Sequence, residues 1–161
     1  MGQTAEPMVD GGCTCGEVRY RMTGAPMFVH CCHCRWCQRE TGSAFAVNAL
    51  IETDRLELLV GNVELVNTPS ESGEGQKIFR CPRCRIALWS NYAMSVGDRI
   101  RFLRVGTLDA PERIAPDIHI FTSSKLPWLP MPDDVPVMDK YYSRKDYWSA
   151  ESVDRFNALR E

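Results

Sequence analysis

Long apolar runs are missing from this chain of 161 residues. No stretch approaches the roughly 20 residues that a helix needs to cross a bilayer, so we expect no membrane span. The opening segment, MGQTAEPMVDGG, lacks the basic region and apolar core of a secretory signal peptide. Glu6 stands where an N-myristoylation site has serine or threonine. These absences predict a cytoplasmic protein.

A surplus of charge is also missing, because 19 Lys and Arg residues face 21 Asp and Glu residues and the net charge is −2. No long run of either sign occurs. Clustered basic charge is what binds nucleic acids and anionic membrane surfaces, so neither is an expected partner. The length and the 44% hydrophobic content fit one globular domain with its own core. The sequence leaves the oligomeric state open.

Cysteine, in contrast, is abundant, with eight residues in the chain. In a reducing compartment such a count favours metal binding over disulfides. The cysteines are closely spaced, as Cys13-x-Cys15, as HCCHCRWC over residues 30–37 and as Cys81-x-x-Cys84. Paired thiolates in such turns can both bind one zinc ion at about 2.3 Å, and the spacings do not match the iron–sulfur patterns. We interpret Cys31 as a buried thiol at a strand end that points away from the others.

Four motifs in this order are similar to those of a known family: GGCTCGEVRY, CHCRWCQRETGSAF, CPRCRIALWS and IHIFTSSKLPW. Together they resemble the glutathione-dependent formaldehyde-activating (GFA) enzymes and the related centromere protein V domain, from about Gly12 to Pro130. We therefore expect a disordered segment over residues 1–10, a GFA-type zinc-binding domain over 11–131 and a C-terminal extension over 132–161.

The resemblance implies two zinc ions per chain. A structural zinc would be held by Cys13, Cys15, Cys81 and Cys84, and an open zinc by Cys32, Cys34 and Cys37. Three protein ligands leave a fourth position for substrate or water, whereas four close the shell. Arg85 follows the late C-x-x-C where the family has glycine, so it is expected to adopt a positive φ at a cost in energy.

The pattern of alternating side chains predicts a mainly β fold. Val18, Tyr20 and Met22 alternate with charged residues, and so do Ile100 and Phe102. Further strands are expected over residues 27–30, 45–51, 55–60, 64–67, 77–80, 86–90 and 117–121. By resemblance these short antiparallel strands form a β-tent pinned by zinc knuckles. Helix is expected only near the C-terminus, where Ser149 is a suitable N-cap for a short docking helix.

A zinc ion with three thiolate ligands is suited to holding a fourth, incoming thiolate. The resemblance implies the matching activity, a zinc-dependent carbon–sulfur lyase acting on adducts of glutathione with an aldehyde, of the S-hydroxymethylglutathione type. Arg35 and Arg39 flank the cluster and are candidates for binding the glutathione carboxylates, although each also fits solvated surface charge. His33 and His119 are candidate proton carriers, against the alternative of structural histidines. Trp36 and Trp128 are expected in the core or the wall of a pocket.

Two other functions stay open from the sequence. One is a non-enzymatic zinc-binding module that recognises a partner, which the resemblance to centromere protein V supports. The other is a thiol redox or zinc-reserve protein, in which the crowded cysteines of residues 31–37 release the metal on oxidation. The physiological aldehyde and thiol are not fixed by the sequence.

Overall fold

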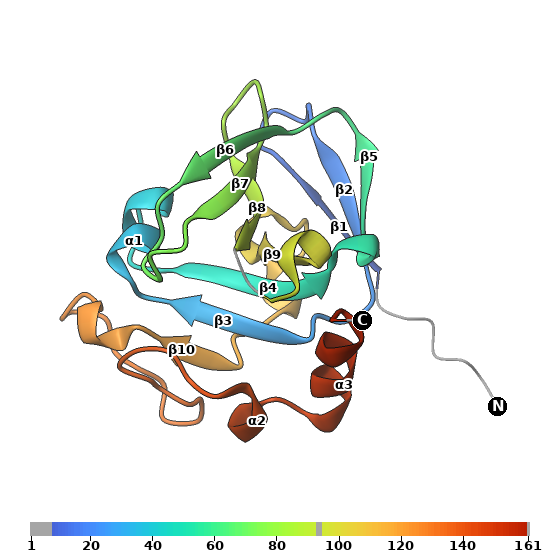
Figure 1. Ribbon diagram of the computed structural model, residues 1–161. Helices are drawn as coiled ribbons and strands as arrows, with labels where there is room; N and C mark the ends of the chain where they lie inside the picture. The colour runs from blue at the N-terminus through green and yellow to red at the C-terminus, as the bar shows by residue number, and fades with distance from the viewer. Residues whose placement is uncertain (1–7, 93–94, 161) are drawn as a thin grey trace.

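The computed structural model describes residues 8–92 and 95–160, and its strands form two sheets (Figure 1). The smaller sheet has the order β1 (Met8–Gly12), β2 (Arg19–Thr23) and β5 (Leu56–Val60). The larger sheet has the order β10 (Ile118–Ile120), β3 (Phe28–Cys32), β4 (Ala46–Glu52), β9 (Ile100–Arg104), β8 (Ala87–Tyr92), β7 (Gln76–Arg80) and β6 (Glu64–Thr68).

The helices are α1 (Arg35–Thr41), α2 (Arg144–Tyr147) and α3 (Ala150–Ala158). Short 3-10 helices lie at Thr53–Arg55, Gly97–Arg99, Val105–Thr107, Pro111–Arg113 and Thr122–Ser124. The fold is therefore mainly β, as the sequence predicts. None of the described helices has the length and apolarity needed to span a bilayer.

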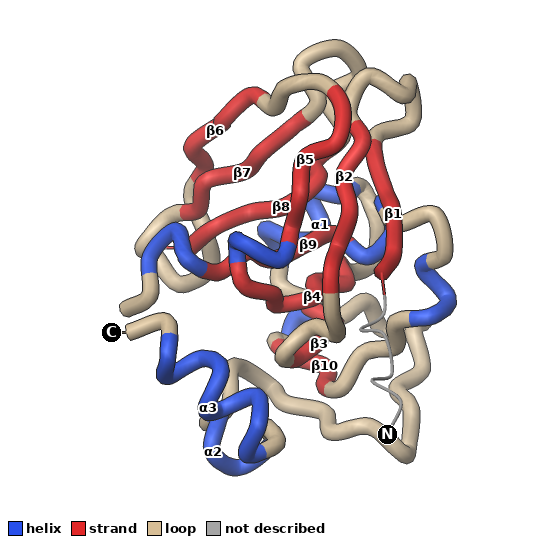
Figure 2. The backbone as a smooth tube through the Cα atoms, turned by 90° about the vertical axis from the view of Figure 1, so that its right-hand side faces the viewer, coloured by secondary structure: helices blue, strands red, loops and turns tan. Residues whose placement is uncertain are grey.

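The main core lies between the two sheets, because the alternating apolar residues of β2 face the larger sheet. Figure 2 shows the three strands of the smaller sheet side by side. Tyr20 and Met22 are almost fully buried. Tyr20 meets Trp89 of β8 edge to face, with ring centroids 5.8 Å apart. This contact between aromatic rings joins the two sheets across the core.

The C-terminal residues pack against the opposite face of the larger sheet, where Trp148 and Phe156 join a second core. Ser149 caps α3, since its side chain accepts a hydrogen bond from the backbone N–H of Ser152. Arg155 of α3 makes two hydrogen bonds, of 2.7 and 2.6 Å, to the carboxylate of Glu52 at the end of β4. The predicted C-terminal helix is confirmed, and it is fastened to the sheet.

Strand β10 is the exception to the expected antiparallel pattern, because it pairs parallel to β3, with Ile118 opposite His30 and Ile120 opposite Cys32. The chain crosses from β9 over 3-10 turns and returns in the direction of β3, which the alternation pattern alone cannot reveal. The other edge of β10 is covered by the segment 136–140. Its contacts include hydrogen bonds from His119 N–H to the carbonyl of Pro136 and from Phe121 N–H to that of Lys140.

Strand β1 and the helices α1 and α2 were not expected from the sequence. Strand β1 includes residues 8–10, although these were predicted to be disordered. They are held in the sheet because Val9 is buried and Asp10 accepts a hydrogen bond of 2.7 Å from Arg21. Residues 1–7 of that predicted segment lie outside the described residues. Helix α1 begins after Cys34, whose sulfur accepts from the backbone N–H of Cys37, and ends at Gly42 in the left-handed conformation.

Candidate metal sites and an adjoining pocket

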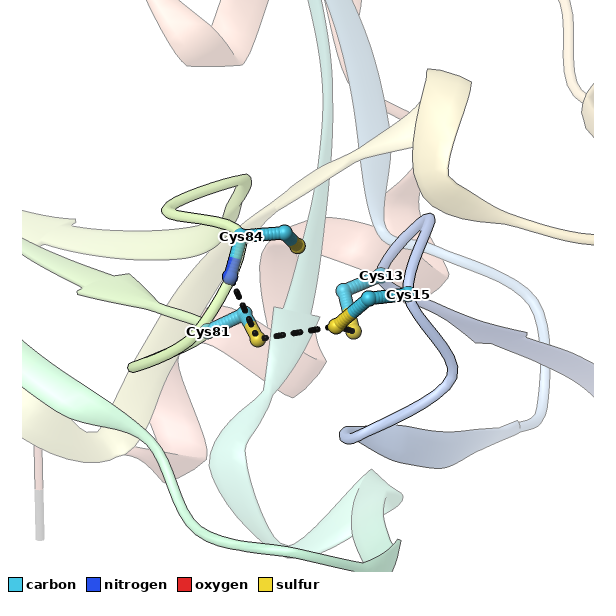
Figure 3. Close-up of side chains that lie close together, drawn as sticks. All are labelled: Cys13, Cys15, Cys81 and Cys84. Atoms are coloured by element: carbon cyan, nitrogen blue, oxygen red, sulfur yellow. Dashed lines mark hydrogen bonds between the residues drawn. The ribbon is translucent and has the colours of Figure 1, made fainter.

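The structure brings Cys13, Cys15, Cys81 and Cys84 together, with all four sulfur atoms within 4.8 Å of one another. Figure 3 shows that the two pairs come from different turns and point toward each other. The sulfur of Cys15 lies 3.5 Å from that of Cys13 and 3.7 Å from that of Cys81. Tetrahedral zinc with bonds of about 2.3 Å places its sulfurs about 3.8 Å apart. The four residues therefore fit a closed zinc site.

Backbone N–H groups around this cluster favour the thiolate form of its cysteines. Val18 N–H donates to the sulfur of Cys13 at 3.3 Å, and Cys84 N–H donates to that of Cys81 at 3.5 Å. The backbone hydrogen bond from Ile86 is the main cause that lowers the pKa of Cys84, to about 6. Zinc binds thiolates rather than thiols, so both turns are prepared for the metal.

Arg85 closes the second of these turns in the left-handed conformation, with φ of 65°. The positive φ expected from the missing glycine is therefore present. Arg85 N–H donates to the carbonyl of Cys81 at 3.0 Å, and Arg80 donates to the carbonyl of Arg85. The turn keeps its shape with arginine at this position, at a conformational cost of about 1–2 kcal/mol.

A second group of three cysteines, Cys32, Cys34 and Cys37, also has its sulfurs within 4.8 Å of one another. Cys32 ends β3, while Cys34 and Cys37 lie at the start of α1. All three are buried. Hydrogen bonds with the thiols of Cys32 and Cys37 lower the pKa of Cys34 well below its ordinary value. Three thiolates without a fourth cysteine in this group fit a metal ion with an open position.

The three cysteines line a pocket of about 440 Å³. Its wall contains Trp36, Tyr92, Phe102, Ile120, Phe121 and Tyr141, and its polar residues include His30, Asn48, Ser70 and Gln76. The exposed residues Glu71 and Glu74 contribute carboxylates to the lining. A pocket of this size that opens onto a candidate metal site is suited to a small molecule. Trp36 thus lies in a pocket wall, whereas Trp128 is 69% exposed, so its expected place in a core or wall is wrong.

The candidate proton carriers His33 and His119 contact each other instead of this pocket. Nε2 of His33 lies 2.9 Å from Nδ1 of His119 and 3.6 Å from the sulfur of Cys31. Burial lowers the pKa of His33 to about 4 and also lowers that of His119. Both imidazoles are therefore neutral at pH 7. Cys31 is buried and lies in this separate group, apart from Cys32, Cys34 and Cys37.

Arg35 and Arg39 are exposed on α1, and neither is among the residues that line the pocket. The arginine that the sequence analysis missed is Arg104, which is only 5% exposed and donates to the side chain of Asn48. Its Nε and Nη2 atoms have no hydrogen-bond partner within the described part of the chain. A hydrogen bond with Cys32 and the charge of Arg104 both lower the pKa of Cys37, although Cys34 and burial raise it overall.

His30, which lines the pocket, was also not expected from the sequence. It is 2% exposed, and its Nε2 atom forms a hydrogen bond of 2.6 Å with the hydroxyl of Tyr142. Strand alternation puts His30 and Cys32 of β3 on the same face. That signal was available from the sequence and would have found His30. The contact with Tyr142 could not be predicted from the sequence, because Tyr142 lies 112 residues further along the chain.

The model of the glutathione-dependent formaldehyde-activating enzyme family matches residues 8–124. The chain belongs to the GFA family. Among solved structures, a Rhodobacter sphaeroides protein is similar at 19% identity and a TM-score of 0.45, over 66% of this chain and 91% of that chain. No curated protein matches this chain. The two cysteine groups and the cysteine-lined wall of the pocket lie within the GFA-matched residues, whereas Tyr141 and Tyr142 follow them.

Proposed function

We propose that this GFA-family chain is a zinc-dependent carbon–sulfur lyase acting on adducts of glutathione with formaldehyde or another aldehyde. The observation that carries the proposal is that Cys32, Cys34 and Cys37 share one small-molecule pocket. Their sulfurs fit zinc, which when bound supplies a position for the sulfur of a thiol substrate. Cys13, Cys15, Cys81 and Cys84 would hold the second zinc ion as a structural site.

Arg104 suits this proposal because a divalent ion with three thiolates carries a single negative charge. A buried guanidinium with unsatisfied N–H groups is costly unless a negative charge lies nearby. The three-thiolate site would supply that charge, and Arg104 would in turn reduce the repulsion felt by an incoming anionic sulfur. The arginine thus acts through the metal site and is a positioning residue.

The proposed reaction makes or breaks one carbon–sulfur bond. In the forming direction the thiolate sulfur adds to the aldehyde carbon, and the carbonyl oxygen takes up a proton to become a hydroxyl. In the reverse direction the hydroxyl loses that proton and the carbon–sulfur bond breaks. Tyr92 and Tyr141 line the pocket, and burial raises the pKa of both phenols. Both therefore stay protonated at neutral pH and can donate a hydrogen bond to the adduct oxygen.

The binding roles expected from the sequence are retained as part of this proposal. Helix α1 carries Arg35 and Arg39 on either side of Trp36, which lines the pocket. These arginines would bind the glutathione carboxylates outside the pocket. His33 and His119 would act indirectly, because His33 lies between Cys32 and Cys34 in sequence but neither histidine lines the pocket.

The test measures the exchange between free glutathione and its formaldehyde adduct by NMR, with zinc-loaded protein. Acceleration that disappears in Cys37→Ser, while that variant keeps the closed zinc site, supports the lyase. Calorimetry with glutathione supplies a second measurement, and Arg35→Ala with Arg39→Ala should weaken binding by about 10-fold or more, as expected for the loss of at least one charge-assisted hydrogen bond of about 1.5–3 kcal/mol. If fully loaded protein neither binds glutathione at millimolar concentration nor accelerates exchange, the proposal is wrong and a partner-binding module becomes the better account.

A further inference from the structure

The pocket beside the three cysteines is larger and more apolar than the hydroxymethyl group of a formaldehyde adduct requires. Its volume of about 440 Å³ is lined in part by the aromatic rings of Trp36, Tyr92, Phe102, Phe121 and Tyr141. The hydroxymethyl group of a formaldehyde adduct has only two heavy atoms, while one water molecule already occupies about 30 Å³ of liquid. Most of the aromatic wall would therefore touch nothing on a formaldehyde adduct.

The charges of the pocket favour an apolar group inside it over the carboxylates of glutathione. Among the described residues that line it there is no lysine or arginine, while Glu71 and Glu74 are present. Glutathione carries two carboxylates, and a carboxylate is stable in a protein pocket only with a cation or several N–H donors. The tripeptide part of an adduct is therefore expected at the pocket mouth, with the substituent on its sulfur directed inward.

One lining residue of the pocket comes from outside the residues that match the GFA family. Tyr141 follows the matched region, which ends at residue 124. Its ring stacks on Tyr142 with centroids 4.9 Å apart. Tyr142 is itself fixed by hydrogen bonds to His30 at 2.6 Å and from Trp148 at 2.7 Å. The C-terminal extension thus supplies a firmly held aromatic side chain to the pocket that the three cysteines line.

We infer that the aldehyde half of the adduct is an apolar, aromatic-sized group, which the wall completed by Tyr141 selects over formaldehyde. This inference rests on the proposed function for the sulfur and adds the class of aldehyde. The substituent would fill the space between Tyr141, Phe121 and Trp36, where aromatic rings pack edge to face or offset. Selection by the C-terminal extension would make aldehyde preference a property of this chain rather than of the matched region.

The test compares two stable glutathione thioethers that differ only in the group on sulfur, S-benzylglutathione and S-methylglutathione. Calorimetry with zinc-loaded protein should give about 10-fold or tighter binding of the benzyl compound, because a buried phenyl ring adds roughly 1.5–3 kcal/mol of transfer free energy. Tyr141→Ala should reduce that ratio to about 3 or less. Tyr141→Phe, which keeps the ring, and Trp128→Ala, which removes an exposed ring, should retain it.

Equal binding of the two thioethers by the wild-type protein would overturn the inference and leave the proposed lyase intact. A ratio that survives Tyr141→Ala would also overturn it, provided that circular dichroism and zinc content show the variant to be folded. Trp36→Ala gives a second removal of the wall and should lower the ratio in the same way. Failure of both thioethers and of glutathione to bind would count against the proposed function itself.

Discussion

Removing one cysteine from each metal site should have very different consequences. The four-cysteine site joins the turn after β1 to the turn after β7, and Cys15 is separated from Cys81 by 66 residues. A cross-link over a loop of this length removes about 4 kcal/mol of chain entropy from the unfolded state, against about 2 kcal/mol for the short loop from Cys32 to Cys37. The first site also joins the smaller sheet to the larger one, so Cys81→Ser should loosen the main core.

We expect Cys81→Ser to lower the thermal midpoint by about 10 °C or more, or to prevent folding, at the roughly 2–4 °C per kcal/mol typical of this chain length. Cys37→Ser should lower it by about half as much or less, because β3 and β4 pair without the local loop. Circular dichroism melts and zinc analysis measure both effects. Cys31→Ala is a matched control that should keep two zinc ions.

A Cys37→Ser variant that melted as low as Cys81→Ser, or a Cys81→Ser variant that kept the wild-type midpoint, would contradict these different roles of the two sites. Two zinc ions in the wild-type protein and one in Cys37→Ser are the expected counts. A single zinc ion in protein purified without chelators would contradict the two-site assignment.

Three further predictions follow from single residues. Arg85→Gly should raise the free energy of unfolding by about 1 kcal/mol in a denaturant titration, because glycine adopts the positive φ without strain, whereas Arg83→Gly in the same turn should not. Burial is the largest single influence on the pKa of Glu52 and raises it, but the hydrogen bonds to Arg155, a backbone hydrogen bond and the charges of Arg155 and Arg55 together lower it overall. The pair with Arg155 therefore contributes stability above the ordinary glutamate pKa of about 4.3 and loses it as the pH falls through the lowered value. Arg155→Met should flatten that acid-side loss, and an unchanged pH profile would contradict the assignment. Arg104→Met should weaken zinc binding at the three-cysteine site by about 10-fold or more in a chelator competition, and unchanged affinity would show that its charge does not act on the metal site.

Local patterns predicted most of the strands and the short C-terminal helix. Alternation at Tyr20 and Met22, or at Ile100 and Phe102, reflects one buried face, and that information lies within a few residues. Helix α1 was missed because its first residues are the metal-binding segment itself and its cap is Cys34, which is not a usual capping residue. Gly42, which ends the helix, was the available signal.

The candidate site likewise has features that local sequence patterns predict and features that depend on contacts between distant residues. Close spacing marked the two cysteine pairs and the cluster over residues 31–37 as metal-binding, whereas the joining of Cys13 and Cys15 with Cys81 and Cys84 was implied only by the resemblance to the GFA family. The pocket depends on contacts that no local pattern contains. Tyr142 contacts His30 from 112 residues away, and Arg104 reaches Asn48 from 56 residues away. Closeness in the chain therefore pointed to Arg35 and Arg39, whereas Arg104 is close to the cysteines only in space.

The segment 136–140 has a consequence for solubility. It occupies the outer edge of β10, where His119 N–H donates to Pro136 and Met138 N–H donates back to His119. An uncovered edge strand offers free N–H and C=O groups on which another copy of the same chain can add a strand. A chain shortened to the GFA-matched residues would expose this edge together with the apolar surface under Trp148 and Phe156. Such a fragment is expected to self-associate as its concentration rises, which light scattering would detect.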